Sequence, residues 1–190
     1  MNAKKLIYPI FALVVLAQLF VPCLMISSKA DIALTGKEFR FKVVNNHAGT
    51  SINGNYLWFR FMDDKYKVTD KKEWERSQTV FVRFNKDTLG FAKIQSVSKF
   101  KPADSFDWVK ARAFLNYKDS TSLQLIYPFN NYYVENANLK EIEEMASQKL
   151  NDSTRVISLK VNIRENQFMV NDLMVDNVSF KDFVKGLSKK

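Results

Sequence analysis

An uninterrupted apolar segment near the start of the chain constrains its architecture more than any other feature. Lys4 and Lys5 precede 21 residues, positions 6–26, that carry no charge and a single amide, Gln18. A helix rises about 1.5 Å per residue, so this segment would span about 31 Å, close to the thickness of a bilayer's hydrocarbon core. The segment therefore predicts a helix that crosses a membrane, and Pro22 is expected to kink or end that helix near its outer end.

Three arrangements are compatible with this segment. We favour a single transmembrane anchor over residues 1–28, followed by an extramembrane domain over residues 29–190. A cleaved signal peptide is the main alternative, because the small residues Ser28 and Ala30 form a weak cleavage pattern. The apolar part of a signal peptide usually has about 7–15 residues, however, and this one is longer. A lipid-anchored lipoprotein attached at Cys23 is the third and least favoured arrangement.

The charges on either side of the apolar segment indicate its orientation. Basic residues prefer the cytoplasmic side of a membrane, and Lys4 and Lys5 lie directly before the segment. We therefore expect the amino terminus in the cytoplasm, one crossing of the membrane, and the domain on its outer side.

Composition narrows the partners and the chemistry of the domain. The chain has 29 basic and 20 acidic residues, and without Lys4 and Lys5 the balance is 27 against 20, about +7. This charge favours anionic lipid headgroups or an acidic partner. The basic residues are scattered rather than clustered, so no nucleic-acid partner is expected. With Cys23 in the apolar segment and His47 as the one histidine, neither an internal disulfide nor a zinc site is expected, and no cofactor is predicted.

Secondary structure after the apolar segment is predicted to be mainly β. Eight segments have strand patterns bounded by turn-forming residues: 38–43, 56–61, 79–84, 91–97, 109–117, 122–127, 156–163 and 167–175. Residues 45–54 read as a polar loop. Asn138 and Glu141 resemble a capping box for an amphipathic helix over 138–150, and Ser179 is expected to cap a short terminal helix. The predicted fold is an antiparallel β-barrel or sandwich-like domain with one amphipathic helix and a short C-terminal helix.

Two short motifs resemble those of the GDYXXLXY-motif proteins, a bacterial family named for Gly-Asp-Tyr-x-x-Leu-x-Tyr. The first motif covers residues 54–61, where Gly54 and Tyr56 match, Asn55 replaces Asp, Phe59 replaces Leu and Phe61 replaces Tyr. The second covers residues 132–136: Tyr132, Tyr133, Val134 and Glu135 resemble an aromatic-Phe-Val-Glu-Glu-Gly segment, with Asn136 in place of the second acid. Residues 171–176 are similar to the family's closing Asp-Leu-x-Val-Asp segment.

The resemblance implies a small protein of unassigned activity, anchored once in the inner membrane of a bacterium with its domain in the periplasm or outside. Members are often encoded beside, or fused to, uncharacterised multi-pass membrane proteins, so the implied partner is such a protein. We therefore hypothesise an accessory or interaction protein whose outer domain docks on a multi-pass membrane protein. The candidate docking residues are aromatic: Tyr56, Trp58, Phe129, Tyr132 and Tyr133. The alternative is a domain that binds a lipid, a glycan or another small ligand in the mouth of a barrel.

The first motif has a simple structural interpretation beside any role in binding. Gly54 can adopt a positive φ and turn the chain into a strand, and Asn55 can hydrogen-bond the turn. Because Asn55 stands where the family has an acid, this position is a poor candidate for acid–base catalysis. An enzyme similar to signal peptidases would need Ser51 beside Lys93 or Lys99, within about 3 Å. No catalytic set is readable from the sequence, and we expect no enzymatic activity.

Overall fold

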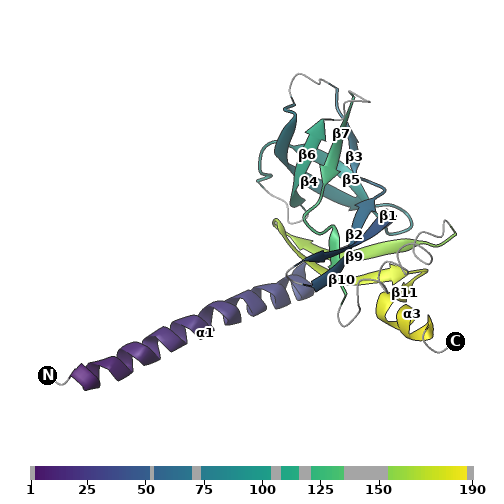
Figure 1. Ribbon diagram of the computed structural model, residues 1–190. Helices are drawn as coiled ribbons and strands as arrows, with labels where there is room; N and C mark the ends of the chain where they lie inside the picture. Colours follow the sequence, from purple (N-terminus) through teal and green to yellow (C-terminus); the bar gives the residue numbers. More distant parts are fainter. Residues whose placement is uncertain are drawn as a thin grey trace.

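The protein consists of one long helix that carries a β-rich domain at its carboxyl end (Figure 1). The computed structural model describes residues 3–51, 54–69, 74–103, 108–115, 121–134 and 154–187. Helix α1, Ala3–Thr35, projects away from the domain, with the amino terminus at its far end. Its Tyr8–Thr35 part is long and apolar enough to cross a membrane, and its apolar window is not buried by the rest of the protein.

Helix α1 continues well past the apolar segment. Pro9 and Pro22 both lie inside it, so of the two effects expected of Pro22, a kink or the end of the helix, the second is wrong. Proline removes one helical hydrogen bond, but the residues that follow it form a helix whose end is fixed against the domain, as described below. About nine residues, 27–35, extend the helix by about 14 Å beyond the apolar segment.

The first sheet has six antiparallel strands in the order β11-β10-β9-β1-β2-β8. Its strands are β1 (Lys37–Ser51), β2 (Gly54–Phe61), β8 (Asn131–Tyr133), β9 (Ile157–Arg164), β10 (Gln167–Val175) and β11 (Val178–Ser179). The amino-terminal half of β1 pairs with β9, and after a register shift between Val43 and Asn45 its second half pairs with β2. This switch of partner places β1 at the centre of the domain.

The second sheet has five antiparallel strands in the order β3-β7-β6-β4-β5. Its strands are β3 (Lys65–Lys67), β4 (Ser77–Lys86), β5 (Ala92–Ser98), β6 (Trp108–Leu115) and β7 (Ser122–Ile126). A bridge between Arg40 and Phe91 connects β1 with the segment that leads into β5. Strands β2, β1, β5, β4, β6 and β7 thereby form a nearly closed barrel that is open between β2 and β7. The mainly β prediction is confirmed, and β9 and β10 extend the first sheet beside the barrel.

An aromatic cluster fills the barrel. Phe41 of β1 is its centre, with ring centroids at 4.7 Å from Phe129, 5.0 Å from Phe84, 5.6 Å from Phe61 and 5.8 Å from Tyr127. All five side chains are buried. They come from both sheets and from the segment between β7 and β8, so the cluster holds the two sheets together.

The prediction of a loop over residues 45–54 is wrong, because most of this polar segment continues strand β1. Residues 45–51 pair with β2, and the hairpin closes between Ser51 and Gly54. Cross-strand pairs explain why polar residues form a strand here. Gly49 lies under the Tyr56 ring, and His47 stacks on Trp58 at 5.9 Å.

The remaining predicted elements have mixed outcomes. Helix α3, Phe180–Leu187, follows Ser179 as expected, and all eight predicted strand segments form strands. The short strands β3, β8 and β11 were not predicted. The predicted helix over 138–150 lies outside the described residues.

The carboxyl end of α1 is fixed to the first sheet by a set of contacts that we call the joint. Ile32 is 1 % exposed. The buried Asn162 amide of β9 donates to the Ile32 and Ala33 carbonyls at 3.3 and 2.8 Å, and Asn171 of β10 donates to the Asn162 side-chain oxygen at 2.8 Å. The Ala33 carbonyl belongs to the last turn, where a helix lacks its own backbone donors, whereas the Ile32 carbonyl also accepts from the Gly36 N–H at 2.9 Å. A side chain of the sheet therefore caps the helix.

Charged side chains and a glycine complete the joint. Arg164 of β9 donates to Asp31 at 3.0 Å and to Thr35 at 2.6 Å. Lys29 donates to the Phe168 carbonyl of β10 at 3.0 Å. Gly36 allows the close approach, because a Cβ there would lie 2.5 Å from the Ile32 carbonyl oxygen. Cations near the carboxyl end of a helix also complement its dipole.

Candidate functional site

The first motif forms the hairpin between β1 and β2. Gly54 has a φ of 112°, a conformation that favours glycine, and its carbonyl accepts a hydrogen bond from the Ser51 hydroxyl. The Asn55 side-chain oxygen accepts a hydrogen bond from the hydroxyl of its cross-strand partner Thr50 at 2.6 Å. The Asn55 carbonyl also accepts from the Val134 amide at 3.0 Å, which connects the first motif to the second.

An aromatic face covers the outer side of β1, β2 and β8 near this hairpin. We use this name for His47, Tyr56, Trp58 and Tyr133. His47 pairs in register with Trp58 and Tyr56 with Tyr133, and the two tyrosine rings are 5.8 Å apart. His47 is exposed, 44 % of Tyr133 is accessible, and Tyr56 and Trp58 are half-buried. The face is thus a continuous aromatic surface at the edge of the sheet.

Four other candidate residues do not belong to this surface. Phe59 and Phe61 point inward with Leu57 and are buried, as their alternation with Trp58 predicts. Phe129 is 1 % exposed, and Tyr132 packs edge-on against Phe180 at 5.9 Å. The expectation that Phe129 contributes to an exposed docking surface is therefore wrong, because its ring is buried in the core. Tyr132 is half-buried against the core, and its role in docking stays a prediction. Glu135 lies outside the described residues.

A pocket of about 290 Å³ opens where the barrel does not close, between β2 and β7. The short edge strands explain its position. Strand β8 covers β2 only as far as Trp58, and β3 covers β7 only as far as Gln124. Beyond these points the segments that flank the short strands stay attached by one backbone hydrogen bond each. The Phe59 N–H donates to the Asn130 carbonyl, just before β8, and the Leu125 N–H donates to the Asp64 carbonyl, just before β3.

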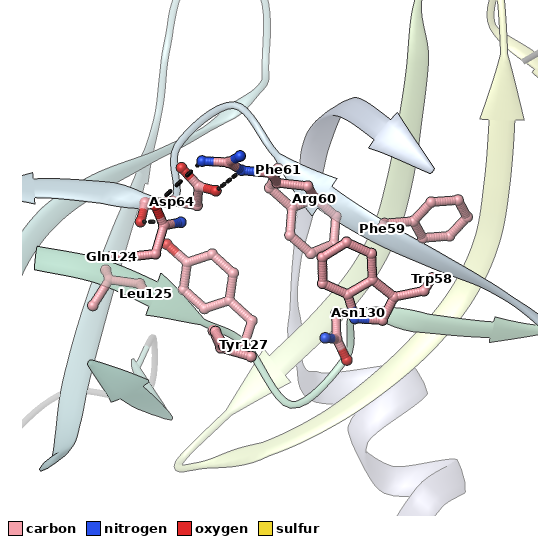
Figure 2. Close-up of a pocket in the computed structure, with 10 residues that line it drawn as sticks. Trp58, Phe59, Arg60, Phe61, Asp64, Gln124, Leu125, Tyr127 and Asn130 are labelled. Atoms are coloured by element: carbon pink, nitrogen blue, oxygen red, sulfur yellow. Dashed lines mark hydrogen bonds and ion pairs between the residues drawn. The ribbon is translucent and has the colours of Figure 1, made fainter. Parts of the chain in front are cut away.

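The pocket has polar side chains in two places, at the group of Arg60, Asp64 and Gln124 and at Asn130, and its other lining residues are apolar (Figure 2). Arg60 donates to the Asp64 carboxylate at 2.8 Å and to the Gln124 side-chain oxygen at 3.2 Å, and Gln124 donates to the Asp64 carbonyl at 3.3 Å. Asn130 lies beside Trp58. The apolar lining includes Phe61, Leu125, Ile126 and Tyr127. The pocket therefore offers donors, acceptors and apolar surface together, which is the composition of a small-ligand site.

Tyr127 joins the pocket to the aromatic cluster. Its hydroxyl donates to the Asp63 carbonyl at 2.6 Å, and its ring stacks on Phe129 at 5.3 Å. Burial raises the pKa of the Tyr127 hydroxyl well above its ordinary value of 10.0, and the charges of Asp63 and Asp64 raise it further. Tyr127 is therefore neutral at physiological pH and acts as a hydrogen-bond donor.

This raised pKa predicts how stability depends on alkaline pH. The folded state holds the Tyr127 proton more tightly than the unfolded state, so its contribution is complete below about pH 10 and is lost as the pH rises from there towards the folded-state pKa. Tyr127→Phe should lower the free energy of unfolding by about 1–2 kcal/mol at pH 7 through the lost hydrogen bond. The same variant should lose less further stability than the wild type between about pH 10 and 11. Denaturant titrations over this pH range measure both effects, and equal alkaline slopes would contradict the assignment.

The residues considered for a Ser–Lys enzyme lie in different parts of the domain. Ser51 is at the hairpin tip, whereas Lys93 of β5 forms an ion pair with Asp63 at 2.8 Å, just beyond the opposite end of β2. At about 3.3 Å per residue these ends of β2 are more than about 20 Å apart. Lys99 lies over the Trp74 ring at 5.0 Å. Within the described residues no group of three or more side chains could hold a metal ion.

The fold and its two surface features define a β-rich domain carried on an apolar helix, with an aromatic face and a small mixed pocket. A family model described as GDYXXLXY protein matches residues 18–169. This match covers most of the chain, so the chain belongs to the GDYXXLXY family, as its motifs indicated. No curated protein and no solved structure matches.

Proposed function

We propose that this protein is a membrane-anchored accessory protein whose β-domain docks on a multi-pass membrane protein. In this proposal α1 crosses the inner membrane once, with Lys4 and Lys5 in the cytoplasm and the β-domain in the periplasm or outside. The joint between α1 and the first sheet is the observation that supports the proposal best. A domain that acted independently of the membrane would need only a flexible connection to its anchor.

The joint holds the domain close to the bilayer. The helix extends about 14 Å beyond its apolar segment, whereas the headgroup region of one leaflet is about 5–7 Å thick. Because Asn162 and Arg164 bind the last turns of α1, the domain sits just above the headgroups in one orientation. The extramembrane loops of a multi-pass protein lie at the same height.

The aromatic face is the surface that we assign to docking. Interface centres are enriched in aromatic residues, and a cluster of partly exposed aromatic side chains on a small domain is a typical feature of interaction sites. The side chains of Tyr56 and Trp58 are held by cross-strand contacts with Gly49 and His47, so they would lose little conformational freedom on binding.

Affinity purification tests this proposal directly. The full-length protein, isolated from native membranes in a mild detergent, should bring a multi-pass membrane protein with it in near-equal amount. Trp58→Ala and Tyr133→Ala should each reduce that recovery by about tenfold or more, as expected for aromatic residues at an interface centre.

The matched control is Phe100→Ala, which removes an aromatic side chain that is 81 % exposed and lies outside the aromatic face. This variant should recover the partner as the wild type does. If no multi-pass protein accompanies the intact chain, the proposal is wrong. If all three folded variants retain the partner equally, the aromatic face is not the docking surface.

A further inference from the structure

We propose that the pocket between β2 and β7 is a binding site for a neutral saccharide of one or two rings. This inference concerns a different surface from the aromatic face, although Trp58 belongs to both. It does not depend on the docking proposal.

The charges of the pocket favour a neutral ligand. Its two ionised side chains, Arg60 and Asp64, form an ion pair with each other at 2.8 Å. Asp64 is nearly inaccessible, with 7 % of its side chain exposed, so the pair is partly shielded from solvent. An anion attracted by the Arg60 guanidinium would be repelled by the adjacent Asp64 carboxylate. A cation attracted by the carboxylate would likewise be repelled by the guanidinium. Neither gains a net attraction from a pair that is already neutralised.

The polar groups of the pocket suit hydroxyls. Two carboxamides that both donate and accept hydrogen bonds line the pocket: Gln124 lies beside the guanidinium–carboxylate pair, and Asn130 lies on another part of the wall. A hydroxyl also donates and accepts, so several hydroxyls on one ring can satisfy such a set.

The apolar lining and the size complete the argument. A sugar ring presents C–H groups on one face, and the aromatic side chains of Trp58, Phe61 and Tyr127 line the pocket. Such aromatic groups bury apolar surface while hydroxyls around the ring remain free to hydrogen-bond. The volume of about 290 Å³ is at the lower end of the range for ligand pockets. A long acyl chain carries no hydroxyls and would make no hydrogen bonds with the polar side chains of the pocket.

Asn130→Ala is the most informative variant for this site. It removes the carboxamide beside Trp58 but keeps the backbone carbonyl that accepts from Phe59, so the frame of the pocket is retained. Tyr133→Ala is the matched control, because it alters the aromatic face at a position that does not line the pocket.

The binding experiment uses the full-length protein in lipid nanodiscs, without sugar-headed detergents. Cellobiose, maltose and N,N′-diacetylchitobiose are titrated up to about 10 mM, a range that detects even millimolar affinity. A second arm uses nanodiscs that contain a glucosyl diacylglycerol, which distinguishes a lipid-borne sugar from a free one. Cyclohexanol serves as a ring with a single hydroxyl. Tryptophan fluorescence and saturation-transfer NMR report occupancy.

We expect saturable binding in at least one sugar arm, weakened about tenfold or more by Asn130→Ala and unaffected by Tyr133→Ala. Binding of cyclohexanol as strong as that of the sugars would overturn the proposal. So would the absence of binding in both arms, or equal affinity in wild type and Asn130→Ala. The two proposals fail in different measurements. Asn130→Ala leaves the aromatic face intact and should recover the membrane partner as the wild type does, whether or not sugar binds in the pocket.

Discussion

Replacing Phe41 with alanine should lower the free energy of unfolding of the β-domain by about 3–5 kcal/mol, the range for truncating a buried phenylalanine in a well-packed core. Phe41 lies at the centre of the aromatic cluster and contacts rings from both sheets, including Phe84 edge-on at 5.0 Å and Phe129 at 4.7 Å. Domains of this size are stable by about 5–15 kcal/mol, so the loss is a large share of the total. Denaturant unfolding of the full-length protein, followed by tryptophan fluorescence, measures it.

Phe100→Ala is the control for this prediction as well, since it removes the same side chain from an exposed position. Its effect should stay within about 0.5 kcal/mol. A loss below about 1 kcal/mol for Phe41→Ala would show that the cluster relaxes around the missing ring and does not hold the two sheets together.

Local periodicity predicted the strands whose side chains alternate clearly. Strand β2 is the best example: Leu57, Phe59 and Phe61 are buried, and Trp58 is on the opposite face, as the sequence indicates. The same reasoning missed the second half of β1. Its residues are polar, and they form a strand only because β2 supplies aromatic partners across the hairpin. A single-sequence pattern does not contain that information.

The pocket was outside the reach of sequence analysis for a related reason. The polar residues of the pocket lie near the ends of strands and follow no sequence spacing typical of a binding motif: Arg60, Asp64, Gln124 and Asn130. They come together because β8 and β3 are too short to cover β2 and β7. Asn162 is an amide between two apolar residues of β9, which weakly indicates a buried polar contact. Its partner is the last turn of a helix about 130 residues earlier in the chain.

Asn162→Ala should release the β-domain from its fixed orientation on α1. The substitution removes the side-chain donor to the Ala33 carbonyl and leaves the Asn171 amide without its acceptor, while the Ile32 carbonyl keeps the Gly36 N–H. Buried groups that lose their partners cost about 1–3 kcal/mol each, so the joint should open locally while the barrel stays folded. Spin labels at Ser28→Cys and Val178→Cys, in a Cys23→Ser background, should give a narrow distance distribution in the parent protein and a broad one in the variant.

Asn85→Ala is the matched control, because it removes an exposed asparagine of β4, a strand of the other sheet. Its distance distribution should remain narrow. An equally narrow distribution in Asn162→Ala would show that the Arg164–Asp31 pair and the buried Ile32 hold the helix without the amide. A broad distribution with reduced partner recovery would connect the joint to docking, because a domain that reorients freely presents the aromatic face at the right height and angle only part of the time.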